Sequence, residues 1–199
     1  MNENYLLSNY FEILKENRIA KYLQCKYTPA FFDKSDSVEK LWLKHDQILK
    51  NIKLSDSIPK QSFLDLKIEI ADRIYQSCCF CERRCKVNRE KEIGNCKVEH
   101  SRVASEFLHI GEEKVLIPSH TIFFSGCTFH CVFCQNWDIS QKNIGTKIKP
   151  SNLVDIICKA KLTGPLILLI SESAYCTRLR TVIGTSGAER SCSLPFWSV

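Results

Sequence analysis

The chain has 199 residues, enough for one ordinary domain or for a domain with a small appendage. Its apolar content of 44% and charged content of 25% are typical of a folded globular protein and exclude a disordered one. The net charge of +6 is spread along the chain, and aromatic residues do not alternate with basic ones, so no nucleic-acid partner is expected.

The sequence shows no sign of export or of membrane insertion. Residues Met1 to Tyr5 lack a basic stretch followed by an apolar core. The longest aliphatic run, Leu166 to Ile170, is far too short to span a bilayer. Twelve cysteines at tight spacing in such a chain favour metal binding over disulfides, so we expect a reducing cytoplasm and no membrane partner.

Residues 1–75 are predicted to form a helical N-terminal segment. Apolar residues recur at helical spacing from Leu6 to Leu14, and Thr28-Pro29 interrupts the pattern. Asp36 to Glu39 has capping-box spacing before a second helix, and Ser62 to Asp65 opens a third. We expect this segment to pack around the rest of the protein, with a docking or lid element as the alternative, and we expect His45 to be a packing or surface histidine.

Residues 76–110 are predicted to form a cysteine-rich metal-binding module. Four thiolates can close a tetrahedral zinc site or a full iron–sulfur cluster, and both remain open here, with free structural cysteines as the alternative. Gly94-Asn95 offers a turn before the last ligand. Neighbouring Cys79 does not fit the spacing. Three arginines are expected in a solvated basic loop, with electrostatic stabilisation of the thiolates as the alternative. The four candidate ligands, at Cys-x2-Cys-x3-Cys-x10-Cys spacing, are Cys78, Cys81, Cys85 and Cys96, and the arginines are Arg83, Arg84 and Arg89.

Residues 111–161 contain a second cysteine pattern, placed directly after an apolar strand. The continuous apolar run from Thr121 to Ser125 predicts a parallel strand covered on both faces, and Gly126 permits a sharp turn after it. Three short-spaced thiolates can converge on one inorganic centre and leave a metal position open for chemistry. A zinc knuckle or a set of buried free thiols is the alternative. The three candidate ligands, at Cys-x3-Cys-x2-Cys spacing, are Cys127, Cys131 and Cys134.

A helix and a second apolar strand are predicted after this pattern. Pro150 to Ala160 has an apolar face with Ser151 as the expected N-cap, and Leu166 to Ile170 reads as a buried strand. Strand, loop, helix and strand form a unit that leads to a parallel neighbour. The predicted fold class is therefore α/β.

The stretch from His120 to Cys127, closed by Cys134-Gln135-Asn136-Trp137, resembles the radical S-adenosylmethionine enzymes, in the branch of the pyruvate formate-lyase activating enzymes. The resemblance implies a partial β/α barrel of the radical SAM type, behind the helical segment and the cysteine-rich module. It implies that Cys127, Cys131 and Cys134 hold a 4Fe-4S cluster, whose fourth iron binds S-adenosylmethionine through its amino and carboxylate groups. The implied activity is that of an oxidoreductase-type activating enzyme, which cleaves S-adenosylmethionine and generates a 5′-deoxyadenosyl radical.

The same resemblance assigns further roles. Phe133 is expected to contact the adenine, and Asn136 and Trp137 to line the cofactor side of the loop. A ferredoxin or flavodoxin is the expected reductant, and the substrate is a protein or a small molecule. The cysteine-rich module also resembles the N-terminal module of that branch. The alternative function is a non-catalytic, cysteine-rich, zinc-binding interaction protein.

Residues 162–199 depart from the family pattern and are predicted to be an aberrant or truncated tail. Where the family has a Gly-Gly-Glu motif after the second strand, this chain reads Ser171-Glu172-Ser173-Ala174. All nineteen lysines lie in residues 1–161, whereas four or five would be expected in the last 38 at the earlier frequency. We therefore expect an incomplete, inactive chain of such an enzyme, with a natural short variant as the alternative.

Overall fold

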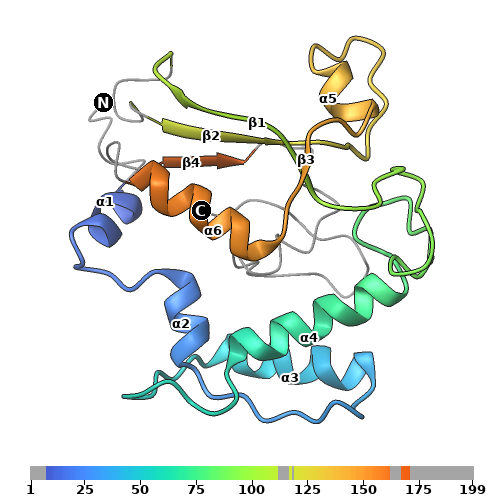
Figure 1. The fold of residues 1–199 in the computed structure, drawn as a ribbon. Helices are drawn as coiled ribbons and strands as arrows, with labels where there is room; N and C mark the ends of the chain where they lie inside the picture. Colours follow the sequence, from blue (N-terminus) through green and yellow to red (C-terminus); the bar gives the residue numbers. More distant parts are fainter. Residues whose placement is uncertain (1–7, 112–116, 118, 162–166, 171–199) are drawn as a thin grey trace. The chain divides into compact units, whose positions relative to one another are not determined.

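The computed structural model describes residues 8–111, 117, 119–161 and 167–170. Its described residues belong to two compact units, one up to Arg73 and one from Ile74 onward. We call them the helical unit and the cysteine-bearing unit, and we treat each by itself (Figure 1). Within the described ranges, no helix combines the length and apolar character needed to cross a membrane. The predicted Ser171–Ala174 position and nearly all of the predicted tail lie outside them.

The helical unit confirms the helical character predicted for its described residues. Its helices are α1 (Ser8–Leu14), α2 (Lys21–Tyr27), α3 (Val38–Lys50) and α4 (Phe63–Gln76), the last of which continues into the cysteine-bearing unit. Helix α2 ends at the predicted interruption, Thr28-Pro29, because a residue before proline avoids helical backbone angles.

Side chains cap both long helices of this unit. Ser37 is the N-cap of α3 and accepts a hydrogen bond from the backbone N–H of Lys40 at 3.3 Å. Ser62 caps α4 reciprocally with Asp65: the Asp65 N–H donates to Ser62 Oγ at 3.2 Å, and the Ser62 N–H donates to Asp65 Oδ2 at 2.8 Å. These bonds satisfy N–H groups that have no partner inside a helix.

The core of the helical unit forms where α3 and α4 supply apolar side chains. Leu41, Phe63 and Leu66 are fully buried. His45 is also buried, with its ring 5.1 Å from those of both Trp42 and Phe63, and burial lowers its pKa. His45 is therefore a packing histidine, as the sequence predicts.

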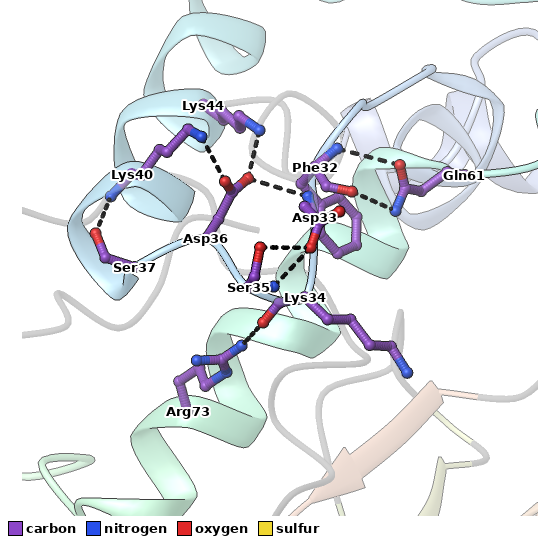
Figure 2. Close-up of polar contacts among 10 residues, drawn as sticks. All are labelled: Phe32, Asp33, Lys34, Ser35, Asp36, Ser37, Lys40, Lys44, Gln61 and Arg73. Carbon is purple, nitrogen blue, oxygen red and sulfur yellow. Dashed lines mark hydrogen bonds and ion pairs between the residues drawn. The ribbon is translucent and has the colours of Figure 1, made fainter.

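A buried carboxylate, Asp36, organises the turn before α3 (Figure 2). It accepts the Asp33 N–H at 3.0 Å and pairs with Lys40 and Lys44, each at 2.5 Å. The Asp33 N–H first, and then the two ammonium groups, hold the pKa of Asp36 well below its usual range. Nearby, the Gln61 side chain bonds both backbone groups of Phe32, at 3.1 and 2.9 Å. The helical unit thus pairs these polar groups internally.

The cysteine-bearing unit contains a four-stranded mixed sheet in the order β3-β1-β2-β4 (Figure 1). Strand β1 (Arg102–His109) pairs antiparallel with β2 (Ser119–Phe124) and with β3 (Thr146–Lys147). Strand β4 (Ile167–Ile170) pairs parallel with β2. The predicted parallel pair is confirmed, although β2 also has an antiparallel neighbour. The β/α barrel remains a prediction.

Helix α6 (Pro150–Lys161) connects β2 to β4 and covers the sheet. Leu153, with Ile156 and Ile157 beside it, packs on buried Ile122 and Phe124 of β2, so the predicted apolar face is confirmed. The predicted N-cap is wrong because Pro150 is already the first helical residue and Ser151 lies inside the helix. Proline fits this position because its missing N–H would have no partner there.

Candidate metal centres

Strand β2 leads directly into the loop that carries the three-cysteine pattern. Ser125 is buried, and its N–H donates to the Arg102 carbonyl at 3.0 Å. The N–H of Gly126 donates to the Ile139 carbonyl at 2.9 Å, and its φ of +90° is in the left-handed region. A Cβ at this position would lie 2.2 Å from Val98 Cγ2, so the turn needs glycine for two independent reasons.

The loop from Gly126 to Asn136, here called the cluster loop, holds three free thiols with graded exposure. Cys131 is exposed, while Cys127 and Cys134 are half-buried. The N–H of Phe129 donates to Cys127 Sγ at 3.4 Å, and Ser140 Oγ lies 3.4 Å from Cys134 Sγ. Hydrogen-bond donors near sulfur orient metal ligands and stabilise the thiolate.

Apolar side chains of the cluster loop and of the helix after it face solvent. Val132 is 99% exposed, Phe133 83% and Trp137 52%. Trp137 begins a short helix, α5 (Trp137–Gln141), that the sequence did not predict, and the Asn136 carbonyl accepts the Ser140 N–H at 2.9 Å in its first turn. The predicted cofactor residues thus lie on both sides of the last thiol: Phe133 directly precedes Cys134, and Asn136 and Trp137 follow it at the start of α5. Neighbouring apolar side chains with this exposure mark a surface for a ligand or a partner.

The four-cysteine segment, residues 78–98, begins with two backbone hydrogen bonds. The Cys78 N–H donates to the Val87 carbonyl and the Lys86 N–H donates to the Cys78 carbonyl, both at 2.9 Å. This pairing places Cys85 beside Cys78. Cys78 and Cys96 are buried, while Cys81 and Cys85 are half-buried. Cys79, which falls outside the spacing, is disulfide-bonded, so it offers no thiolate.

Burial raises the pKa of the Cys78 thiol to about 11. The Phe80 N–H and the Arg89 guanidinium act in the opposite direction, while the neighbouring Cys85 thiol adds to the increase. In the metal-free protein this thiol is therefore protonated at neutral pH.

Arg89 lies in a different environment from the solvated loop that the sequence predicts, since it is only 6% exposed. Its Nη1 donates to Cys96 Sγ at 3.3 Å, and its Nη2 donates to the Val98 carbonyl. A Cβ on Gly94 would lie 2.4 Å from Arg89 Nη1 and 3.0 Å from Cys85 Sγ. Gly94 therefore leaves room for both Arg89 Nη1 and Cys85 Sγ, and this glycine, two residues before Cys96, was the sequence signal for the close approach.

The four-cysteine segment contacts the cluster loop at two points and the residues after α5 at a third. Arg83 Nε donates to the Thr128 carbonyl at 3.3 Å, inside the cluster loop. Asn143, just beyond α5, donates from Nδ2 to the Lys97 carbonyl at 2.8 Å. Val98 packs against Gly126. Two cysteine patterns about 30 residues apart in the sequence are thus neighbours in the fold, which their spacing alone did not predict.

Both patterns supply suitable donors, although their sulfurs are not gathered around a metal position. Each predicted ligand is a free thiol. Within the part of the chain that the structure describes, no three cysteine, histidine or acidic side chains converge closely enough to hold an ion. Three thiols on one loop fit a 4Fe-4S cluster in number and chemical type, and four thiols fit a closed metal site.

Comparison with known proteins finds one uncharacterized relative. The chain is similar to an uncharacterized protein of Methanocaldococcus jannaschii, with 46% identity over 141 residues, which is 68% of this chain. The chain spans 42% of the length of that relative. No protein-family model matches the chain, and no solved structure matches it.

Proposed function

We propose that this chain carries the cofactor-binding part of a radical S-adenosylmethionine enzyme related to the pyruvate formate-lyase activating enzymes. The observation that supports this most is a loop of three free thiols, Cys127, Cys131 and Cys134, that begins where buried strand β2 ends. Strand β4 lies parallel to β2 and is reached through α6, as in the repeating unit of a β/α barrel. Such barrels carry their chemistry at the carboxyl ends of the strands, which is where β2 bears the thiols.

In this proposal Cys127, Cys131 and Cys134 would hold a 4Fe-4S cluster, and the iron without a protein ligand would be available to S-adenosylmethionine. When bound, the cluster supplies the electron that cleaves the cofactor to a 5′-deoxyadenosyl radical. The chain's own side chains bind, orient and exclude water. The exposed rings of Phe133 and Trp137 offer apolar faces to the cofactor, Phe133 to its adenine, and Asn136 lies between them.

The proposal also names partners and a compartment. A ferredoxin or flavodoxin is the reductant, and the substrate is a protein or a small molecule that the radical attacks. An oxygen-sensitive cluster and free thiols suit a reducing cytoplasm. The substrate and the activity belong to the whole protein, because the chain spans 42% of the length of its relative.

Anaerobic reconstitution with iron and sulfide tests the proposal. We expect about four iron and four sulfide per cluster loop and a cluster whose spectrum changes when S-adenosylmethionine is added. Cys131→Ala abolishes this cluster because a ligand is lost. Cys158→Ala is the matched control, since Cys158 is an exposed free cysteine on α6. An unchanged cluster in Cys131→Ala contradicts the assignment.

A zinc-binding interaction protein is the second candidate. It is favoured by the exposure of Val132 and Phe133 beside the thiols, which suits a protein partner as well as a cofactor. Metal analysis separates the two functions. Iron with sulfide bound through the cluster loop supports the enzyme, whereas zinc alone at both cysteine patterns supports the interaction protein.

A further inference from the structure

We propose that Cys78, Cys81, Cys85 and Cys96 bind one zinc ion, with Arg89 as a hydrogen-bonding residue outside the ligand set. This site lies outside the cluster loop and does not depend on the proposed enzyme function. The following contacts of the four-cysteine segment carry the proposal.

The first observation is that candidate ligands lie near a buried guanidinium. Arg89 Nη1 lies 3.3 Å from Cys96 Sγ, and Arg89 Nη1 and Cys85 Sγ both approach the position that a Cβ of Gly94 would occupy. The two backbone hydrogen bonds between Cys78 and residues 86–87 place Cys85 beside Cys78. Three of the four candidate ligands are thus neighbours of one another or of Arg89.

The second observation is the backbone around the candidate ligands. Arg84 and Lys86, on either side of Cys85, have φ values of 40° and 58°, and Lys97, directly after Cys96, has 57°. Non-glycine residues adopt this left-handed region rarely, and when they do it often marks a functional site. Tight turns also hold the other ligand positions: the Arg84 N–H donates to the Cys81 carbonyl at 3.0 Å, and the Lys97 N–H donates to the Gly94 carbonyl at 2.8 Å.

The third observation concerns the kind of metal. Four protein thiolates close a tetrahedral zinc site with no position left for substrate, and Cys78 and Cys96 are buried accordingly. Zinc–sulfur bonds of about 2.3 Å require sulfurs in mutual contact. Cys85 is a neighbour of Cys78, which favours the compact ligand set of one zinc ion over the wider one of a four-iron cluster.

Arg89 partly neutralises the negative charge of this proposed site. Four thiolates around Zn²⁺ carry two excess negative charges, and a guanidinium at hydrogen-bond distance offsets one of them. Groups outside the ligand set orient the ligands and strengthen metal binding about 10- to 100-fold. Closing the site requires Cys96 to approach the Cys78–Cys85 pair while Arg89 keeps its hydrogen bond to sulfur.

The experiment uses the full chain with Cys127, Cys131 and Cys134 all replaced by alanine, so that the cluster loop cannot contribute metal. We expect one zinc per chain in this background. Cobalt substituted for the zinc should give intense tetrahedral bands and a thiolate-to-cobalt charge-transfer band, and neither measurement needs a further substitution in the site. Absence of a tightly bound metal, or iron with sulfide in place of zinc, overturns the proposal.

Single substitutions in the same background assign the ligands. Cys96→Ala should abolish the four-thiolate cobalt spectrum, and Cys158→Ala should leave it unchanged because Cys158 is exposed on α6. Arg89→Gln should weaken zinc binding about 10- to 100-fold with the four-thiolate spectrum retained, and Arg89→Lys should recover part of the loss. Unchanged zinc affinity in Arg89→Gln overturns the role given to Arg89.

Discussion

The helical unit and the cysteine-bearing unit satisfy their polar groups in different ways. In the helical unit, Asp36 pairs with its lysines, His45 Nδ1 lies 3.1 Å from Asp46 Oδ1, and both long helices have side-chain caps. In the cysteine-bearing unit, seven free thiols lie in two short stretches, next to residues with strained backbone and beside exposed aromatic rings.

The difference indicates which part of the molecule depends on a bound group. Side-chain packing and capping can stabilise a helical unit without help. In our proposals both cysteine patterns bind metal, and metal coordination then contributes to the stability of the cysteine-bearing unit. We therefore expect the two units to respond differently to metal removal, to core substitutions and to pH.

Metal removal should have the largest effect. We expect amide hydrogens of residues 78–98 and 126–143 to lose about a hundredfold or more of their exchange protection, because metal binding contributes directly to folding free energy. Amides in α3 and α4 up to Arg73 should keep theirs. Hydrogen exchange of the full chain, with and without metal, measures both at once. Equal loss of exchange protection in the two units would contradict the expectation that metal stabilises the cysteine-bearing unit selectively.

A matched pair of phenylalanines sharpens the comparison. Phe63 is fully buried, so Phe63→Ala should lower the free energy of unfolding by about 3–5 kcal/mol. Phe133 is 83% exposed, so Phe133→Ala should change it by less than about 0.5 kcal/mol while weakening the binding of S-adenosylmethionine. Denaturant titration and equilibrium binding measure the two effects. A large destabilisation in Phe133→Ala would show that the cluster loop packs as a core.

Gly126→Ala tests whether the cluster loop depends on one backbone position. The left-handed φ and the Val98 contact should cost about 1–3 kcal/mol of unfolding free energy and impair iron incorporation. Gly111→Ala is the control, since the nearest neighbour of its Cβ would be His109 Cε1 at 3.3 Å. Iron content and thermal unfolding measure both variants. Equal losses of stability and iron content in Gly126→Ala and Gly111→Ala would show that the turn after β2 has no particular requirement for glycine.

The smallest expected effect is a pH dependence in the helical unit. The folded-state pKa of Asp36 is depressed, so its contribution is present above the unfolded pKa of about 3.9 and is lost as pH falls below it. Asp36→Asn should therefore flatten the acid limb of the unfolding free energy below about pH 4. Asp138→Asn, which breaks an exposed pair with Lys142, should leave that limb unchanged. An unaltered limb in Asp36→Asn would contradict the role of the Asp36 turn.

The sequence determined the elements with strong local signals. Helical periodicity and Ser/Asp capping fixed α3 and α4, since caps and apolar spacing act within one or two turns. The apolar runs that became β2 and β4, with a helix between them, indicated their parallel pairing. Gly126 predicted the turn into the cluster loop, and cysteine spacing identified both candidate ligand sets.

Only the tertiary structure decided how these parts meet. Arg89 is predicted in a solvated loop, yet the fold of the four-cysteine segment buries it, with Nη1 donating to Cys96 Sγ. The antiparallel partner of β2 and the contacts from Arg83 to Thr128 and from Asn143 to Lys97 join residues 10 to 46 positions apart. Local propensity carries no information about such pairs, because their geometry is set by how the sheet and the loops pack against each other.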